Sequence, residues 1–290
     1  MYTKPLLIGC MKLGTWGAQF NTTELGKFVD ECLELGLDEF DHADIYGGHT
    51  TEREFGALLS SRPDLKQELK LTTKCGIAYP SDQRPEIGLK HYNSSKEYIL
   101  KCIDASLRDL QVEQIHTFLI HRPDYLMNFE EIADAISTAK ASGKILHFGV
   151  SNFKPEQIQL LSNYVEVVTN QIEISIDHLE PFEDGSLEML LSKKIQPCAW
   201  SPLAGGQVFT SDQEKYQRIR KVAEELAEKY STELDAILVA WLRKHPAGVI
   251  PVLGTSKVAR IKSALKGTSI TLTHEEWYSL WTASTGHKVA

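Results

Sequence analysis

The sequence predicts an α/β protein, a (β/α)8 TIM barrel with additional C-terminal helices and active-site loops. Strand-like apolar runs and helix-like segments alternate about eight times along the 290 residues. Helical crossovers require parallel strands, and eight such units are what a closed barrel needs. A doubly wound open sheet is the alternative. It would more naturally carry G-x-G-x-x-G after its first strand, and the sequence has no such motif there.

The expected strands are short runs rich in buried-type residues, each bounded by turn or polar residues. They are Leu6–Met11, Glu39–Asp41, Leu69–Lys74, Ile115–His121, Ile145–Ser151, Val167–Glu173, Gln196–Ser201 and Val249–Val252. Helices are expected where apolar residues recur at intervals of three and four. Two series show this spacing clearly: Leu25, Phe28, Val29, Cys32, Leu33, and Ile99, Ile103, Leu107, Leu110. Further helices are expected over Glu52–Ser60, Phe129–Ser142, Pro155–Ser162, Leu187–Ser192, Tyr216–Tyr230 and Lys257–Leu265.

Three segments are additional to the eight units. Residues 231–245 and Thr273–Thr285 are expected to add helices near the C-terminal end. Gly76–Asn93 is a polar connection longer than ordinary strand-to-helix loops, so we expect it to shape a substrate mouth. No linker or composition shift divides the chain, which predicts a single domain over residues 1–290.

Composition limits the partners and the compartment. Hydrophobic residues make up 42%, enough for a large core, and no apolar run approaches the ~20 residues that span a bilayer. A net charge of -8 without a basic cluster argues against nucleic acid and membrane as partners. The five cysteines are scattered and contain no C-x-x-C, which favours reduced thiols in the cytoplasm over disulfides or structural zinc. A monomer or weak homo-oligomer is expected.

Polar residues stand where three successive strands end: Asp41 and Tyr46 after the second, Lys74 at the third and His121 at the fourth. Each alone has an ordinary structural interpretation, as a solvated charge, a cap or a rim residue. At one barrel mouth, however, an ammonium beside a phenol would lower the phenol pKa, and a carboxylate would hold the ammonium in place. A nearby histidine could orient a carbonyl oxygen. The set suits protonation of a developing alkoxide.

Seven motifs follow one another through the chain: FDHADIYGG, LTTKCG, FLIHRPD, HFGVSNF, TNQIEIS, AWSPLAGG and VIPVLGTSKVARI. In this order and spacing the sequence resembles the aldo-keto reductase superfamily, from Leu6 to about Lys266. DHADIYGG and LIHRPD are similar to its bacterial YdhF-like branch. The resemblance implies NADPH-dependent reduction of a small-molecule aldehyde or ketone to an alcohol. Tyr46 would be the general acid, Lys74 and Asp41 its supporting pair, and His121 the group that orients the carbonyl.

The same resemblance implies the cofactor NADP(H). The implied cofactor-binding residues are Gly9, Cys10, Met11, Asp41, Ser151, Asn152, Gln171, Trp200, Ser201, Leu203, Gly205, Thr255, Ser256, Lys257 and Arg260. Ser151, Asn152 and Gln171 would bind the nicotinamide carboxamide, and Trp200 would stack on the ring. The segment from Ser201 to Gly205 would begin the pyrophosphate loop.

The run from Thr255 to Arg260 follows the eighth strand and leads into a helix, a place where barrel proteins commonly bind phosphate. Ser256, Lys257 and Arg260 offer a hydroxyl, an ammonium and a guanidinium for the 2′-phosphate that distinguishes NADP from NAD. This run therefore predicts a preference for NADP(H). Gly254 and Ala264 depart from residues that many family members use at the adenosine end.

Other interpretations stay open at this point. A metal-dependent barrel hydrolase could use His42, Asp44 and His49, although the paired histidines expected after a first strand are missing, so no metal is expected. A non-catalytic NADP(H)-binding sensor or regulatory subunit could share the fold. His42 replaces a small residue of the family and is expected to crowd the site. The candidate substrate-pocket residues are Met11, Trp16, His42, Tyr79, Tyr92, Arg122 and Gly286–Ala290.

Overall fold

The computed structural model describes residues 2–290, and its sheet topology confirms the predicted fold class. The barrel closes in the order β1-β10-β9-β8-β7-β6-β3-β2. Its strands are β1 (Leu7–Gly9), β2 (Glu39–Asp41), β3 (Lys70–Cys75), β6 (Ile115–Ile120), β7 (Ile145–Ser151), β8 (Thr169–Glu173), β9 (Gln196–Trp200) and β10 (Ile250–Leu253). Two of them, β2 and β7, have the predicted bounds. The others begin or end one or two residues away from the prediction.

The chain forms two compact units. The first runs up to Gln171 and includes Gly254–Ser256, whereas the second comprises Ile172–Leu253 and Lys257–Ala290. Each unit is described here by itself. That residues 1–290 form a single domain stays a prediction.

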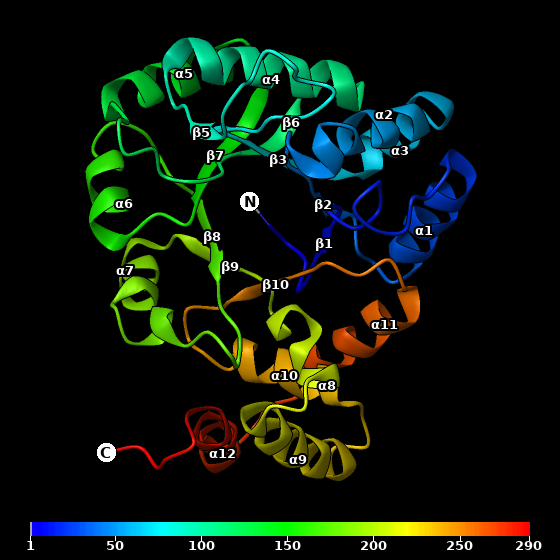
Figure 1. The fold of residues 1–290 in the computed structure, drawn as a ribbon, viewed down its shortest axis with the longest axis vertical. Coiled ribbons are helices and arrows are strands. Elements are labelled where there is room, and N and C mark those ends of the chain that lie inside the picture. Colours follow the sequence, from blue (N-terminus) through cyan, green and yellow to red (C-terminus); the bar gives the residue numbers. More distant parts are fainter. Residues whose placement is uncertain (1) are drawn as a thin grey trace. The chain divides into compact units, whose positions relative to one another are not determined.

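The helices of the first unit follow the predicted alternation with the strands. They are α1 (Thr22–Glu34), α2 (Thr51–Ser61), α3 (Leu65–Glu68), α4 (Lys96–Leu110), α5 (Phe129–Ala141) and α6 (Pro155–Leu161). Figure 1 shows α4 and α5 on the outer side of β6 and β7. The apolar stripe of α4, which includes Ile99, Cys102 and Ile103, is buried as its spacing predicts. Side chains at the N-caps of α1, α4 and α5 accept backbone N–H groups and start these helices.

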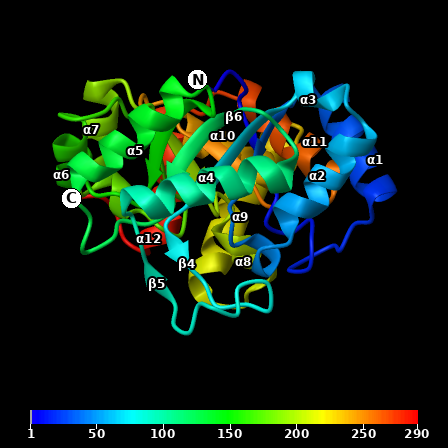
Figure 2. The same cartoon turned by 90° about the horizontal axis from the view of Figure 1, so that it is seen from above.

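The connection over residues 76–93 contains a small antiparallel hairpin that the sequence did not predict. Its strands are β4 (Ile77–Ala78) and β5 (His91–Tyr92), paired through Ile77 with Tyr92 and Ala78 with His91. Figure 2 shows the hairpin and its connecting loop projecting beyond α4. Strands of two residues lack the alternation that identifies longer strands, so the pattern gave no signal for them.

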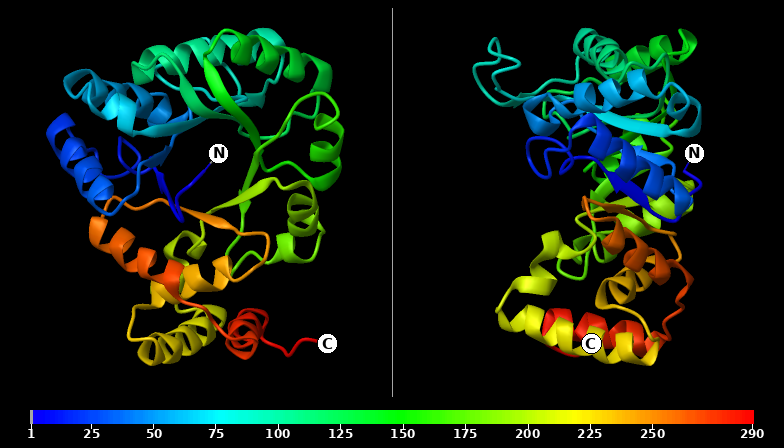
Figure 3. Two further views of the ribbon diagram at one scale, coloured as in Figure 1. Left: turned by 180° about the vertical axis from the view of Figure 1, so that it is seen from behind. Right: turned by 90° about the vertical axis from the view of Figure 1, so that its right-hand side faces the viewer.

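The second unit carries both of the predicted additional helices. Its helices are α7 (Ser186–Lys193), α8 (Gln207–Thr210), α9 (Glu214–Lys229), α10 (Leu234–Arg243), α11 (Val258–Lys266) and α12 (His274–Thr285). Both views of Figure 3 show α9 and α12 side by side. Trp241 of α10 stacks on Trp277 of α12 with ring centroids 5.0 Å apart, and Phe182 contacts both rings. This aromatic cluster holds the C-terminal helix in place.

None of the helices within residues 2–290 is long and apolar enough to cross a membrane.

Candidate active site

The predicted polar residues meet at one end of the strands of the first unit. Asp41 is the last residue of β2, Lys74 is the penultimate residue of β3, and His121 directly follows β6. These three strands are parallel neighbours in the sheet, so their carboxyl ends lie at the same barrel mouth. Tyr46 begins the short 3-10 helix η1 (Tyr46–Gly48) a few residues after β2.

Lys74 is the centre of this cluster. Its Nζ donates to Asp41 Oδ2 at 2.7 Å, to the His42 carbonyl oxygen at 2.7 Å, and to Tyr46 Oη at 3.3 Å. An ammonium has three N–H groups, and each one therefore has an acceptor. The lysine side chain is fully buried, so only such pairing makes its charge tolerable there. The geometry holds a fixed positive charge against the phenol oxygen of Tyr46.

A tight turn presents Tyr46. Gly47 has a φ of 64°, and a Cβ atom at this position would come within 3 Å of the hydroxyl oxygens of Thr15, Thr50 and Thr51. Two of these hydroxyls instead donate to the Gly47 carbonyl, Thr15 at 3.0 Å and Thr50 at 3.1 Å. The turn therefore requires glycine and is fixed by its neighbours.

The histidine of the cluster faces the tyrosine. The His121 ring lies edge-on to the Tyr46 ring, with centroids 6.1 Å apart and an interplanar angle of 82°. Burial, and then the positive charges of Lys74 and Arg122, hold the pKa of His121 well below its ordinary value. Its Nδ1 is buried without a hydrogen-bond partner in the described chain. The imidazole is thus neutral at physiological pH.

The expected lowering of the tyrosine pKa is wrong for this structure. Burial raises the pKa of Tyr46 above its ordinary value, and Lys74 offsets only part of that increase. Burial would lower the pKa of Lys74, but Asp41 and Tyr46 beside it raise the pKa instead. At neutral pH the site therefore holds a protonated phenol next to a charged ammonium. Such a phenol can give up its proton, and the ammonium can stabilise the phenolate that remains.

Three further predicted residues adjoin the cluster from β7 and β8. Gln171 donates from Nε2 to Asp41 Oδ1 at 2.9 Å. Asn152 donates from Nδ2 to the His121 carbonyl at 3.1 Å and to Ser151 Oγ at 2.8 Å, and Ser151 Oγ donates to the Gln171 carbonyl at 2.7 Å. Asn152 has a φ of 61°, in the left-handed region that asparagine tolerates better than most residues. These amide and hydroxyl groups are of the kind that pairs with a carboxamide.

The end of β1 lies beside Asp41. Gly9 lies opposite Asp41 in the register of β1 and β2, and the Cys10 amide donates to the Asp41 carbonyl at 2.9 Å. Cys10 is fully buried, whereas Met11 is 37% exposed. The structure thus places Gly9 and Cys10 beside the cluster and leaves the Met11 side chain in contact with solvent.

In the second unit, the loop after β9 has an unusual backbone. Trp200 ends β9 half-buried. Positive φ angles follow at Ser201 (50°), Ala204 (52°), Gly205 (59°) and Gly206 (89°). Non-glycine residues in this region are uncommon and tend to occur at functional sites. Concavities that backbone N–H groups form around such conformations bind anions.

The residues predicted to bind the 2′-phosphate lie in the chain segment after β10. Thr255 and Ser256 are half-buried, and Lys257 is the N-cap residue of α11. Arg260 is exposed near the start of that helix, which has no acidic residue in its first turn. The helix N-terminus and its basic side chains favour an anion here.

His42 does not crowd the site, and this expectation is wrong. Its side chain is fully buried and lies edge-on against Phe55 of α2, with ring centroids 4.6 Å apart. Successive residues of a strand point to opposite faces, so Asp41 faces the barrel interior and His42 faces the helix layer. Burial, followed by the charge of Lys74, lowers the pKa of His42 to about 3, so the ring is neutral. Within residues 2–290 no group of three or more His, Cys, Asp or Glu side chains could hold a metal ion.

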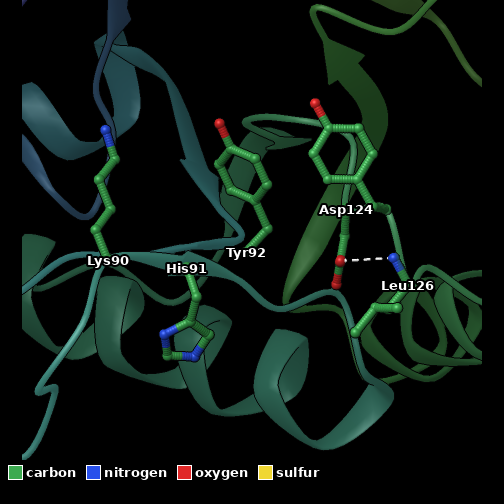
Figure 4. Close-up of a pocket in the computed structure, with 6 residues that line it drawn as sticks. Lys90, His91, Tyr92, Asp124 and Leu126 are labelled. Carbon is green, nitrogen blue, oxygen red and sulfur yellow. Dashed lines mark hydrogen bonds between the residues drawn. The ribbon is translucent and has the colours of Figure 1, made fainter.

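Aromatic residues lie around Tyr46 in the first unit. Trp16 approaches Tyr46 and Tyr79 with centroid distances of 6.4 and 6.0 Å. Tyr79 and Tyr92 also pack on the small apolar cluster beneath Tyr46. A neighbouring hollow has a volume of about 400 Å³, and Tyr92 and residues 124–126 belong to its lining. Figure 4 shows Tyr92 and Asp124 as two of the side chains around it. The hairpin over residues 76–93 therefore adjoins the predicted site, whereas Gly286–Ala290 belongs to the second unit.

The comparisons with known proteins agree with this arrangement. The model of the aldo/keto reductase family matches residues 5–283.

The chain belongs to the aldo/keto reductase family.

Three relatives of this aldo/keto reductase match nearly full length. The uncharacterized oxidoreductase YcsN of Bacillus subtilis strain 168 is 42% identical over 97% of this chain and 94% of its own. The 6-dehydroglucose reductase of Agrobacterium fabrum strain C58 is 37% identical over 90% and 88%. Oxidoreductase YdhF of Escherichia coli K12 is 35% identical over 98% and 94%. The predicted YdhF-like branch is confirmed.

Solved structures support the fold of this aldo/keto reductase. The glycerol dehydrogenase of Gluconobacter oxydans superposes with a TM-score of 0.86, at 23% identity, over 98% of this chain and 92% of the other. At this identity the likeness shows the fold alone.

Sequence reasoning missed one polar residue that shapes the mouth of this aldo/keto reductase. Asp124 is buried, and its Oδ2 accepts from the Ser94 amide at 3.1 Å and the Ser94 hydroxyl at 3.2 Å. Its Oδ1 accepts from the Leu126 amide at 2.9 Å (Figure 4). Asp124 therefore ties the segment after His121 to the end of the hairpin connection. The only signal in the sequence was its place in the HRPD motif.

Proposed function

We propose that this aldo/keto reductase is an NADPH-dependent oxidoreductase that reduces an aldehyde or ketone to an alcohol, with Tyr46 as the general acid. The observation that carries the proposal is the buried series from Asp41 through Lys74 to Tyr46, joined by contacts of 2.7 and 3.3 Å. A phenol held against a fixed ammonium can give its proton to a substrate oxygen, and the ammonium then stabilises the phenolate that remains.

Each residue of the cluster has a separate task in this proposal. Tyr46 gives its proton to the carbonyl oxygen as that oxygen becomes an alkoxide. Lys74 stabilises the phenolate that results, and Asp41 keeps the ammonium in position and charged. The neutral His121 offers a hydrogen-bonding ring nitrogen to the substrate carbonyl and so orients it. Asp41 is a positioning residue, since Lys74 stands between it and the phenol.

The donor set around Asp41 fits a nicotinamide cofactor. A bound NADPH would supply the hydride. Ser151, Asn152 and Gln171 present hydroxyl and amide groups that match a carboxamide, and the contact of Gln171 with Asp41 holds that amide in place. Gly9 and Cys10 would bring the backbone close to the same ring.

The segments that follow β9 and β10 are proposed to hold the rest of the cofactor. Trp200 offers a half-buried indole for stacking, and the positive-φ loop that starts at Ser201 and includes Leu203 and Gly205 offers backbone amides for the pyrophosphate. In the segment after β10, we propose that Ser256, Lys257 and Arg260 bind the 2′-phosphate, with Thr255 beside them. A basic helix start without acidic residues supports NADP(H) over NAD(H).

The substrate is proposed to be a small carbonyl compound, with sugar aldehydes first among the candidates. Two relatives carry the name 6-dehydroglucose reductase, at 37% and 30% identity over at least 90% of this chain. The aromatic side chains of Trp16, Tyr79 and Tyr92 near Tyr46 are suited to packing on the apolar face of a sugar. A cytoplasmic monomer or weak homo-oligomer is proposed, and the five free thiols support a reducing compartment.

The test is cofactor oxidation measured at 340 nm with NADPH and NADH, across a panel of sugar aldehydes, simple aldehydes, ketones and dicarbonyls. The proposal expects turnover with at least one carbonyl class and a higher kcat/KM for NADPH. Tight binding of NADPH without turnover on any class would instead support the non-catalytic regulatory subunit. Turnover with NADH preferred would contradict the cofactor assignment.

A further inference from the structure

The hollow beside the proposed active site has exposed apolar side chains around it. Its volume of about 400 Å³ lies in the range usual for small-molecule sites. Its lining residues are Lys90, His91, Tyr92, Asp124, Tyr125 and Leu126. Tyr125 is 93% exposed, Leu126 is 90% exposed, and Leu89, which precedes Lys90, is 75% exposed. Among residues 2–290 only one other large apolar side chain, Val289, is more than half exposed. Apolar side chains gathered in this way mark a binding surface.

A buried carboxylate fixes the turn that carries two of these side chains. Asp124 Oδ1 accepts from the Leu126 amide at 2.9 Å, and the Met127 amide donates to the Asp124 carbonyl at 3.1 Å. The other carboxylate oxygen, Oδ2, accepts from the amide and the hydroxyl of Ser94 at 3.1 and 3.2 Å. The turn is therefore tied to the segment after β5, and it holds Tyr125 and Leu126 in solvent. A surface fixed before the ligand arrives loses less entropy on binding.

Tyr92 belongs both to the lining of the hollow and to the surroundings of Tyr46. It packs on the same small apolar cluster as Tyr46. Its ring also approaches the Tyr125 ring, with centroids 6.4 Å apart and an interplanar angle of 50°. Figure 4 shows Tyr92 and Lys90 extending to one side and His91 to the other, as alternation along a strand requires. A substrate whose carbonyl lies at Tyr46 can therefore extend along Tyr92 into the hollow.

The lining favours a flat apolar group over a polar one. Aromatic rings pack with centroids about 4.5–7 Å apart, and the pair of Tyr92 and Tyr125 can accept a further ring in this way. The Leu126 side chain adds apolar surface. Among the six lining residues the one carboxylate, that of Asp124, already accepts from Ser94 and Leu126, and none of the six has an amide side chain. A second sugar ring would find few acceptors here for its hydroxyl groups, whereas an aryl ring needs none.

From this arrangement we propose that the hollow binds an aromatic ring of the substrate, so that the preferred substrate is a carbonyl compound with an aryl group remote from its carbonyl. Among the proposed sugar aldehydes, this class comprises the aldehydes of aryl glycosides. The inference rests on the proposed function, because it takes Tyr46 to mark the carbonyl end. Tyr125 and Leu126 contact the ring and take no part in proton or hydride transfer. Their effect therefore falls on KM and leaves kcat similar.

The kinetic experiment uses the full chain with NADPH and two matched pairs of substrates. One pair is the C6 aldehydes of phenyl β-glucoside and methyl β-glucoside, and the other is 4-phenylbutanal and butanal. In each pair that is turned over, the KM of the member with the ring should be lower by about tenfold or more, with similar kcat. Equal KM values within both pairs would overturn the proposal.

Two variants assign the preference to the hollow. Tyr125→Ala and Leu126→Ala should each bring the ratio of the two KM values toward one. Both side chains are exposed, so their removal should leave the fold intact. The matched control is Tyr164→Ala, which removes an exposed tyrosine from the connection between α6 and β8, and it should keep the ratio of the wild type. An unchanged ratio in Tyr125→Ala and Leu126→Ala would overturn the assignment of the ring to this hollow.

A binding measurement separates this proposal from the proposed function. Saturation-transfer NMR with phenyl β-glucoside, which has no carbonyl to reduce, is recorded on the protein with NADPH present. The phenyl protons should receive saturation from the wild type and from Tyr164→Ala but not from Tyr125→Ala. This result without reduction of any aldehyde would contradict the proposed function and support the ring site, whereas reduction without any effect of the ring would overturn the ring site alone. Sedimentation that shows a wild-type dimer and a Tyr125→Ala monomer would assign the exposed side chains to a second copy of the chain and overturn the proposal.

Discussion

Gln171 donates a hydrogen bond of 2.9 Å from its side-chain amide to Oδ1 of Asp41, across 130 residues of sequence. The other carboxylate oxygen accepts from Lys74 at 2.7 Å. One buried carboxylate therefore connects the residue proposed to bind the nicotinamide carboxamide with the ammonium that faces the phenol. This relationship couples the proposed cofactor site to the proposed acid.

Replacing Gln171 by leucine should lower both the stability of the folded protein and its catalytic efficiency. The change leaves Asp41 Oδ1 buried without its donor, a loss that typically costs about 1–3 kcal/mol of stability. We expect kcat/KM to fall by about tenfold or more. Urea unfolding and steady-state kinetics measure the two effects. The control is Gln114→Leu, which removes an exposed amide contact with the Gly143 carbonyl. Equal behaviour of the two variants would contradict the coupling.

The pKa of Tyr46 makes a prediction about pH. Because burial raises this pKa, the phenol stays protonated through neutral pH and loses its proton only above the ordinary tyrosine value of about 10. The rate of carbonyl reduction should therefore be level from about pH 6 to pH 9 and fall only at higher pH. Alcohol oxidation needs the phenolate and should rise with pH over the same range. A reduction rate that falls with an apparent pKa near 8 would show that the lysine effect outweighs burial.

Glu52 is a buried acid behind the site with its own effect on stability. Its Oε1 accepts from Thr73 Oγ1 at 2.5 Å and its Oε2 from Ser106 Oγ at 3.1 Å, but burial raises its pKa to about 7. A pKa raised above the unfolded value means that the folded state binds the proton more tightly. Its contribution is complete below pH 4.5 and is lost as the pH rises to about 7.

Glu52→Gln should remove that pH dependence. Glutamine keeps an acceptor for Thr73 and gains a donor for Ser106, with no charge to bury. The free energy of unfolding of the wild type should fall relative to the variant by up to about 3 kcal/mol between pH 5 and pH 8. Urea unfolding followed by circular dichroism at several pH values measures this difference, with the exposed Glu225→Gln as control. A constant difference between wild type and variant across the range would refute the raised pKa.

Arg260 tests the cofactor preference. If its guanidinium binds the 2′-phosphate, Arg260→Ala removes a charge-assisted contact of about 1.5–3 kcal/mol and should weaken NADPH by roughly ten- to a hundredfold. NADH affinity should hardly change. Fluorescence quenching with both cofactors measures the dissociation constants, and Lys262→Ala, exposed on the same helix, is the control. An equal loss for both cofactors would reject the site.

Much of the fold was predictable because alternating strands and helices repeat regularly. The strand-end positions of Asp41, Lys74 and His121 followed from the same pattern, since parallel strands of a barrel share one functional end. The hairpin of β4 and β5 was not predictable, because strands of two residues carry no periodicity.

The remaining differences between the sequence-based expectations and the structure depend on side-chain direction and packing. His42 follows Asp41, and period-two alternation already indicates that the two side chains face opposite ways, so this signal was available and was not used. The raised pKa of Tyr46 was not available, since desolvation depends on packing by Ala43, Ile45 and Ile77.

The most direct test of the central claim is the reduction rate of Tyr46→Phe. The substitution keeps the ring and removes only the proton that the proposal assigns to the substrate oxygen. Reduction should slow by about a hundred- to ten-thousandfold, while the dissociation constant of NADPH changes little. Tyr79→Phe, in the same aromatic surroundings, should stay close to the wild type. Turnover of Tyr46→Phe within a few-fold of the wild type would contradict the account.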